Sequence, residues 1–390
     1  MGDTINGLYL SDSMIKLGIE CENLEDAKSR WGVGRLVLNL LKEYEKNPIW
    51  QKEFKLYLYF NQFIPDDVVL RNPIFIKRVV GWRSLRSFNL FYHILMPLRA
   101  MRDGLNFMFF PAYMLPPLYF GKAVTLLTND VYYEYTKGSL PFKYKLAYRL
   151  FSNWAARFSH KILAISEASK KEVAKLYNIP STKIFVSKLG VELYEDSTDN
   201  HEKSDKPRIN RVYMLYVGQM FPRRHAKETI LAFEQIATEY KDVNLILVGR
   251  DKYSPSIINQ LVNETNNRLS GVRIIHHDYI QNYDEIINLY KHALLVIYVS
   301  DSEAFGLPPV EAASLGTPVV VMDNDLNHEL FSSSAFFSRS GNVADIANAL
   351  RSGLSNDDRR GHFAEEYKRI MPQLSWYNFA KNFFDNVKKQ

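Results

Sequence analysis

Cysteine is nearly absent from this 390-residue sequence, because Cys21 is the only one. A single thiol cannot form a disulfide within the chain, so a reducing compartment is the expected setting. The first residues, MGDTINGLYLSD, lack the basic start and apolar core of a secretory signal. No apolar run reaches the roughly 18 residues that are needed to span a bilayer. The sequence therefore predicts a cytoplasmic protein without a membrane-spanning segment.

Acidic residues are also scarce in the first half of the chain. Residues 1–195 contain 27 lysines and arginines and 18 acidic residues, a net charge of +9, whereas residues 196–390 carry −3. No acidic residue occurs between Val68 and Arg102 or from Tyr135 to Ser166, where basic residues alternate with apolar ones. Such runs are typical of proteins that contact an anionic membrane surface or a nucleic acid. They are equally typical of helices with an apolar core face and a solvated basic face, and no nucleic-acid recognition motif accompanies them.

Length and composition favour two globular domains. The sequence is 46% hydrophobic and 24% charged, which is typical of a globular protein. A chain of 390 residues is longer than a domain with a single hydrophobic core usually is. Short apolar runs alternate with segments of helical periodicity, which predicts α/β domains with parallel sheets. The expected strands of the first half are GLYLSD, FKLYLYF, LNFMFFP, AVTLLTND and KILAIS, and those of the second half are VYMLYVG, NLILVG, VRIIHH, LLVIYVS and PVVVM.

A polar stretch divides the two halves. Residues 195–210 contain no large apolar side chain before Ile209, so this stretch is the expected linker. Ligands of open parallel sheets bind outside the carboxyl ends of the strands, so both sheets can face a common cleft.

The segment YVGQMFPRRHAKETILAF, directly after the linker, has the features of a phosphate-binding loop. A strand ends at Gly218, which permits a close approach of the backbone to a ligand. Arg223, Arg224 and Lys227 follow beside the start of a helix, where phosphate is bound by amides and guanidinium groups. The Walker pattern of P-loop proteins is absent. A solvated basic turn is the alternative interpretation.

The segment SEAFGLPPVEAASLGTPVV places two glutamates eight positions apart, Glu303 before a turn and Glu311 after it. The two prolines predict the start of a helix that ends at Gly316, with Glu311 in its first turn. There the carboxylate could simply stabilise the helix dipole, whereas Glu303 lies ahead of the turn. Carboxylates accept hydrogen bonds from sugar hydroxyls, and the intervening amides can face an anion. A nucleotide sugar has hydroxyls at both ends and phosphate in the middle.

This segment resembles the Glu-x7-Glu signature of the retaining glycosyltransferases of family 4. The resemblance extends to YVGQMFPRRHAKETILAF, DEIINLYKHALLVIYVSDSEAFG, LAISEASKKEVAKLYNIPSTKIFVSKLGVE, WGVGRLVLNLL and LSWYNFAKNFF. It implies the GT-B architecture, in which two Rossmann-like α/β/α domains face a central cleft. The implied limits are residues 1–200 for the acceptor-side domain and 201–372 for the nucleotide-sugar domain, with a C-terminal helix in 373–390 that packs back on the first domain.

The resemblance also implies roles for residues that match the family pattern. Glu303 contacts hydroxyls of the donor hexose, and Glu311 binds the ribose diol. Arg224 neutralises the leaving diphosphate and forms, with Glu303 and Asp130, the expected catalytic set. The other implied donor-binding residues are Gly218, Arg223, Lys227, Phe305, Gly306 and Leu307. On the acceptor side the implied residues are Gly34 and Asn129, and Tyr279 and Ile280 lie where the family holds the base.

Three positions depart from the family pattern. Asn129 replaces the usual histidine beside Asp130, and an amide can donate a hydrogen bond but cannot take a proton. Ala304 stands where a glycine is common, and the usual lysine-asparagine of the phosphate loop is Arg224-His225, which keeps a cation. The sole candidate for a metal site, HHD at residues 276–278, is interpreted as structural, so no metal cofactor is expected.

The implied function is transfer of a hexose, with mannose as the leading candidate, from GDP-mannose or a UDP-sugar to a glycan or lipid-linked acceptor. This activity belongs to polysaccharide or lipopolysaccharide biosynthesis. The basic first half suits an acceptor on the inner face of the plasma membrane. Two alternatives from other classes are a non-catalytic nucleotide-sugar-binding protein, which Asn129 favours, and a nucleic-acid-binding protein, which no motif supports.

Overall fold

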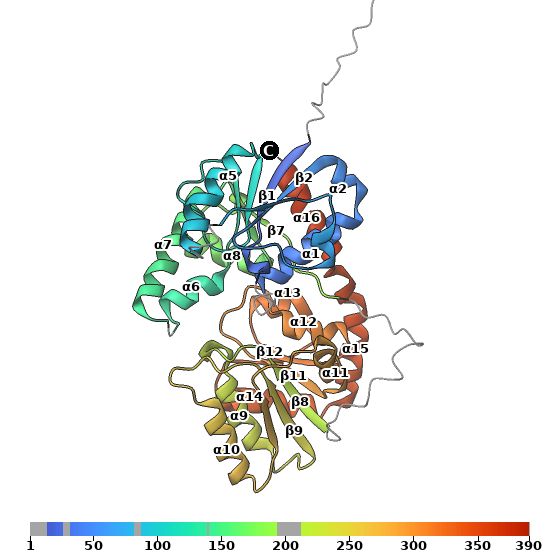
Figure 1. The fold of residues 1–390 in the computed structure, drawn as a ribbon. Coiled ribbons are helices and arrows are strands. Elements are labelled where there is room, and N and C mark those ends of the chain that lie inside the picture. The colour runs from blue at the N-terminus through green and yellow to red at the C-terminus, as the bar shows by residue number, and fades with distance from the viewer. Residues whose placement is uncertain (1–13, 26–31, 82–86, 139, 193–211, 390) are drawn as a thin grey trace, which may run out of the picture. The chain divides into compact units, whose positions relative to one another are not determined.

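The structure is a computed structural model, and it describes residues 14–25, 32–81, 87–138, 140–192 and 212–389. The expected strand GLYLSD and the expected linker of residues 195–210 lie outside these ranges. Two sheets are present, and helices follow most of their strands, as the alternating pattern predicts (Figure 1). The predicted α/β class with two parallel sheets is therefore confirmed.

The first sheet has seven strands in the order β3-β2-β1-β4-β5-β6-β7. Four of the expected apolar runs form strands in it, because strands buried on both faces read as continuous hydrophobic segments. Its inner strand β1, IKLGIE, was not among the expected strands, since Lys16 and Glu20 interrupt its apolar pattern. The bounds are β1 Ile15–Glu20, β2 Phe54–Phe60, β3 Ile76–Val79, β4 Phe107–Phe110, β5 Ala123–Leu126, β6 Lys161–Ala164 and β7 Ile184–Val186.

The second sheet has six strands in the order β10-β9-β8-β11-β12-β13, and every neighbouring pair is parallel. The order reverses between β8 and β11, so the loops that leave their carboxyl ends diverge and open a crevice between them. This reversal fixes where a ligand of the sheet can bind. The bounds are β8 Val212–Val217, β9 Val243–Val248, β10 Ile274–His277, β11 Leu295–Tyr298, β12 Val319–Met322 and β13 Phe336–Ser338.

Helices connect the strands of both sheets. Those of the first half are α1 Val33–Lys46, α2 Pro48–Glu53, α3 Val68–Arg71, α4 Phe88–Leu90, α5 Met96–Arg102, α6 Asn129–Thr136, α7 Phe142–Phe158 and α8 Glu167–Leu176. Those of the second half are α9 Ala226–Ile236, α10 Ile258–Arg268, α11 Tyr283–His292, α12 Leu307–Ser314, α13 Asp325–Phe331, α14 Val343–Leu354, α15 Asp357–Ile370 and α16 Trp376–Lys388. In the described part of the chain, no helix combines the length and the apolar character that a bilayer crossing requires.

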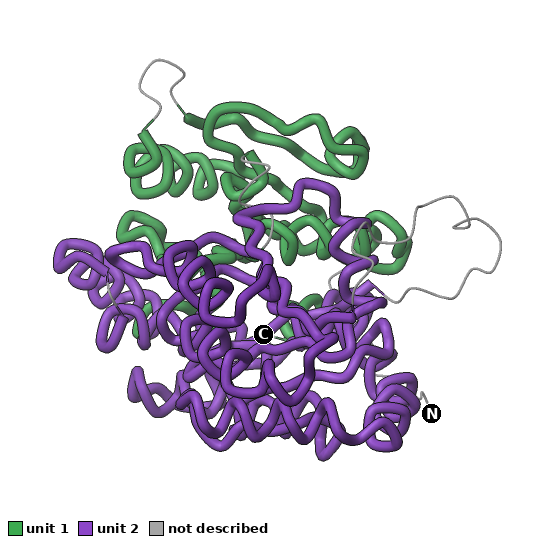
Figure 2. The backbone as a smooth tube through the Cα atoms, turned by 90° about the horizontal axis from the view of Figure 1, so that it is seen from below, with its two compact units in different colours: residues 1–126, 157–162, 383–390 green, residues 127–156, 163–382 purple. Residues whose placement is uncertain are grey.

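The chain divides into two compact units, which Figure 2 distinguishes by colour. Unit 1 comprises residues 1–126, 157–162 and 383–390, and unit 2 comprises residues 127–156 and 163–382. In unit 1 the last turns of α16 join the core, where the Phe384 ring centroid lies 5.0 Å from that of Trp50 and 4.9 Å from that of Phe54. The predicted domain limit at residue 200 falls outside the described residues, and the predicted limits stay a prediction.

Candidate active site

The candidate site lies in unit 2, at the point where the strand order of the second sheet reverses. The loop after β8 begins at Gly218, where a φ of +143° favours glycine and an added Cβ would lie only 3.2 Å from the Tyr298 ring. It continues into a short 3-10 turn, Pro222–Arg224, ahead of α9. The loop after β11 runs through Ser300 and Glu303 to α12. Topology alone thus brings the two predicted motifs together.

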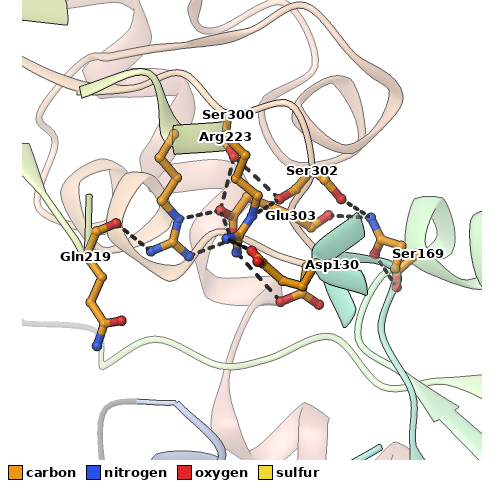
Figure 3. A network of polar contacts seen from close by, with 10 residues as sticks. Asp130, Ser169, Gln219, Arg223, Ser300, Ser302 and Glu303 are labelled. Carbon is orange, nitrogen blue, oxygen red and sulfur yellow. Dashed lines mark hydrogen bonds and ion pairs between the residues drawn. The ribbon is translucent and has the colours of Figure 1, made fainter. Parts of the chain in front are cut away.

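Arg224 forms a bidentate ion pair across these loops with Glu303, which Figure 3 labels. Arg224 Nε donates to Glu303 Oε1 at 2.6 Å and Nη2 donates to Oε2 at 3.1 Å, and Ser300 Oγ donates to Oε1 at 3.1 Å. Burial alone would raise the pKa of Glu303, but the charges of Arg224 and then Arg223 hold it below its usual value. The glutamate is therefore a carboxylate at neutral pH and a ready hydrogen-bond acceptor.

The guanidinium of Arg224 also stacks on aromatic rings. Its Cζ lies 5.3 Å from the centroid of Tyr298 and 5.5 Å from that of Phe221. Its Nη1 donates to Gln219 O at 3.1 Å. These contacts fix the cation beside the carboxyl end of β11. The alternative of a solvated basic turn is wrong for the two arginines, whose side chains are mostly buried.

Arg223 links the site to α6. Its Nη1 donates to Glu134 Oε1 at 2.6 Å, its Nε donates to Ser302 O at 3.0 Å, and its Nη2 lies 3.8 Å from Asp130 Oδ2. The guanidinium of Arg223 thus contacts Glu134, Ser302 and Asp130. Its contact with the donor stays a prediction. Sequence reasoning missed Glu134, because it precedes its partner by 89 positions.

Asn129, at the start of α6, also bonds the loop that carries Glu303. Its amide nitrogen donates to Glu303 O at 3.1 Å and to Ser302 Oγ at 3.3 Å, and its oxygen accepts from Ser169 Oγ at 2.9 Å. Ser166 Oγ donates to Ala304 O at 2.8 Å. The asparagine therefore positions the Glu303 backbone, which requires a donor and an acceptor on one side chain. Sequence reasoning missed both serines.

Asp130, the second residue of α6, contacts Arg223 through one of its two carboxylate oxygens. Oδ2 faces Arg223, while Oδ1 is buried and bonds to no donor among the described residues. This position, next to Asn129, brings the predicted catalytic carboxylate into the same unit as Glu303. Its catalytic role stays a prediction.

Glu311 is not in the first turn of its helix, contrary to the prediction. Helix α12 begins at Leu307, two residues before Pro309, so Glu311 is its fifth residue and cannot cap it. The carboxylate is nearly buried, and it accepts from Tyr283 OH and Tyr290 OH at 3.2 Å each. Two phenol donors therefore orient the group that is the predicted ribose ligand.

The N-terminus of α12 offers amide hydrogens. Gly306 is the residue before the helix and has a φ of +81°, while Pro308 and Pro309 contribute no N–H. In the described residues no acceptor bonds the amides of Phe305, Gly306 or Leu307. Phe305 and Gly306 also line a small pocket with Glu303, Tyr298, Ser300 and Asn324. An anion in this pocket would meet the helix dipole and these N–H groups.

The remaining predicted site residues differ in burial and in the unit to which they belong. Lys227 is an exposed residue in the first turn of α9, and Gly34 is buried in α1 of unit 1. Tyr279 and Ile280 follow the carboxyl end of β10, with Tyr279 exposed and Ile280 buried. Their implied roles stay predictions.

The HHD segment is engaged by protein groups. His276 Nε2 lies 2.8 Å from Gly249 O, and its Nδ1 lies 2.7 Å from Asn259 Oδ1. Among the described residues, no three His, Cys, Asp or Glu side chains are grouped as a metal site requires.

Comparison with known proteins finds a family match in the second half of the chain. Residues 197–370 match the family model of glycosyl transferases group 1. The O-antigen chain mannosyltransferase RfbU of Salmonella typhimurium is 28% identical over 215 residues, which cover 55% of this chain and 56% of RfbU. The chain thus spans only about half the length of this curated relative.

Solved structures share the fold of nearly the whole chain. HepE of Anabaena, solved with UDP and glucose, has a TM-score of 0.71 at 16% identity, covering 96% of this chain and 100% of HepE. WaaG, a glycosyltransferase involved in lipopolysaccharide biosynthesis, has a TM-score of 0.68 at 14% identity, covering 96% of this chain and 100% of WaaG. The fold is therefore that of glycosyltransferases of the GT-B class, as the sequence predicted. Assignment to family 4 stays a prediction.

Proposed function

We propose that this protein is a retaining hexosyltransferase that uses a nucleoside-diphosphate sugar, with GDP-mannose as the first candidate donor and UDP-sugars as the second. The observation that carries the proposal is the Arg224–Glu303 ion pair, which lies where the strand order of the second sheet reverses, beside the amides that precede α12. The relative RfbU supports mannose, and the complex of HepE supports a uridine nucleotide.

The pair supplies the two kinds of contact that such a donor needs. Arg224 and the amides of Gly306 and Leu307 can balance the charge of a diphosphate, and Glu303 can accept hydrogen bonds from hexose hydroxyls. On binding, each member of the ion pair exchanges part of its contact with the other for a contact with the donor. Glu311, held by two tyrosines, is placed to accept from the ribose diol.

Transfer proceeds by attack on the face from which the diphosphate departs. The bond between the anomeric carbon and the phosphate oxygen breaks, and a bond from that carbon to the acceptor oxygen forms on the same side. The acceptor proton passes to the departing diphosphate, so no protein base has to hold it. Arg224 and the helix-end amides stabilise the charge that develops on the leaving group, which is electrostatic catalysis.

The acceptor in this proposal is a glycan or a lipid-linked saccharide of a polysaccharide or lipopolysaccharide pathway, at the cytoplasmic face of a membrane. WaaG and RfbU, whose names refer to lipopolysaccharide and O-antigen synthesis, support this class. The basic residues of the first half agree with an acceptor on an anionic surface.

Donor turnover tests the proposal. The protein is incubated with GDP-mannose or UDP-glucose, with and without a lipid-linked saccharide from a lipopolysaccharide-producing bacterium, and released nucleoside diphosphate is measured. We expect release that the acceptor accelerates and a product with the donor's anomeric configuration by NMR. A protein that binds the donor but releases no diphosphate with any acceptor would instead be the non-catalytic binding protein, which the replacement of histidine by Asn129 favours.

A further inference from the structure

Helix α7, Phe142–Phe158, has its large apolar side chains on the outside. Its fully buried residues are small, namely Ser152, Ala155 and Ala156. The exposed fractions of its large apolar residues are 80% for Phe142, 60% for Leu150, 50% for Tyr144 and 44% for Leu146. An ordinary surface helix has the opposite arrangement. The alternative of an apolar core face and a solvated basic face is therefore wrong for α7.

Three of these exposed residues form one stripe. Phe142, Leu146 and Leu150 are four positions apart, so they lie above one another on a helix of 3.6 residues per turn. The buried residues Ser152, Ala155 and Ala156 follow the stripe, in the C-terminal half of the helix. Small residues let the helix pack closely on the protein while the bulky side chains stay in solvent. The exposed stripe therefore results from the order of large and small residues along α7 and from the packing of its small residues on the protein.

The charge around the stripe is of one sign. Helix α7 contains Lys143, Lys145, Arg149 and Arg157 and no acidic residue. Acidic residues are absent from the whole of residues 135–166. Lys143 follows Phe142, and its Nζ lies 5.0 Å from the centroid of the Tyr144 ring. Aromatic and aliphatic groups interspersed with cations complement the headgroups and acyl chains of an anionic bilayer.

We propose that the outward face of α7 docks on the surface of an anionic lipid bilayer. The inference rests on the part of the proposed function that places the acceptor at a membrane, and it names the surface that makes the contact. The apolar side chains enter the boundary between headgroups and acyl chains, while the lysines and arginines contact lipid phosphates. A second copy of this chain is a poorer occupant, because two such faces would bring cations opposite cations.

Vesicle co-sedimentation of the full chain tests the proposal. Vesicles of phosphatidylcholine with phosphatidylglycerol are compared with vesicles of phosphatidylcholine alone. We expect binding to the anionic vesicles that weakens as salt rises. The triple variant Phe142→Ser, Leu146→Ser and Leu150→Ser should bind at least about tenfold more weakly, because three apolar side chains no longer enter the lipid.

A second variant isolates the charge. Lys143→Gln with Arg149→Gln should reduce binding to anionic vesicles and flatten its salt dependence. The matched control is Ile49→Ser with Val68→Ser, whose side chains are 66% and 78% exposed in unit 1, and it should bind like the wild type. Circular dichroism and melting temperature verify that each variant is folded.

Three results would overturn the proposal. The wild type could fail to bind anionic vesicles, or the triple variant could bind as well as the wild type. The chain could also form dimers that the triple variant abolishes while vesicle binding is unchanged, which would assign the face to a second copy. The assay contains no donor and no acceptor, so its failure is distinguishable from a failure to transfer sugar.

Discussion

At the scale of single residues, the Arg224–Glu303 pair holds the two loops of the site together. The side chains of Arg224 and Glu303 are only 16% and 12% exposed, so removing one charge leaves the other poorly solvated. We expect Glu303→Gln to lower the free energy of unfolding by about 2 kcal/mol or more. The same variant should lose most diphosphate release, because the hexose loses its anionic hydrogen-bond acceptor.

Thermal denaturation and the turnover assay measure the two effects. Ser300→Ala serves as a comparison, since it removes a hydrogen bond from an uncharged hydroxyl to the same carboxylate, leaves the ion pair intact and should cost only about 1.5 kcal/mol. Wild-type turnover by Glu303→Gln would show that this carboxylate is a purely structural partner of Arg224.

A second residue, Glu20, should make stability depend on pH. Burial at the end of β1 raises its pKa from the usual 4.5 to about 8, and the nearby charges of Glu22 and Glu25 act in the same direction. Below pH 4.5 Glu20 is protonated in both the folded and the unfolded chain, so its titration takes nothing from the free energy of unfolding. As pH rises toward 8 only the folded chain holds it, so the free energy of unfolding falls by about 1.4 kcal/mol for each pH unit.

Chemical denaturation at pH 5 and pH 8 checks this expectation for wild type and Glu20→Gln. The variant should show a smaller loss of stability between the two values, because glutamine carries no proton to release. Glu365→Gln, at a side chain that is 69% exposed, should keep the wild-type dependence. Equal slopes in Glu20→Gln and wild type would contradict the raised pKa.

At the scale of elements, the two ends of α12 provide a matched pair of glycines. Gly306 precedes the helix with a φ of +81° and Gly316 follows it with a φ of +80°, and a Cβ at either position would meet no atom closer than 3.6 Å. An alanine at each position should therefore cost a similar amount of stability, about 1–2 kcal/mol, through the backbone alone. Only Gly306→Ala should also weaken donor binding, because it changes the amides that face the pocket.

Isothermal titration of both variants with GDP and UDP separates the two effects. A similar loss of affinity in Gly306→Ala and Gly316→Ala would indicate that the N-terminus of α12 is not a phosphate site.

Helices and strands were predictable from the sequence where neighbouring residues determine the local structure. Most strands were evident as apolar runs, and proline and glycine gave the ends of α12 to within one or two residues. The start of that helix was placed slightly late, which moved Glu311 into the first turn. The inner strand β1 was missed because Lys16 and Glu20 interrupt its run of apolar residues.

The partners of the site residues were not predictable, because they come from distant parts of the chain. Arg223 bonds Glu134, and Ser166 bonds Ala304, which lies 138 positions later in the chain. Nothing local in either segment indicates such a pairing. The predicted motifs were nevertheless brought together, since the order of parallel strands decides which loops are neighbours.

At the scale of the whole molecule, the candidate site is contained in one compact unit. Asn129 and Asp130 were expected on the first domain, yet they lie in unit 2 together with Arg223, Arg224 and Glu303. Helix α6 thereby becomes part of the framework that positions Glu303. Binding of a donor nucleotide can therefore be tested at this site without an acceptor present.

The most direct test of the central claim is a thermal-shift titration of the full chain with GDP, UDP, GDP-mannose and UDP-glucose. A ligand that binds only the folded protein raises the melting temperature, by an amount that grows with its concentration. We predict a shift with one nucleoside diphosphate and its sugar, and a smaller shift in Glu311→Gln, whose side chain lacks the charge that holds the ribose. Absence of a shift with all four compounds at millimolar concentration would contradict the proposed function.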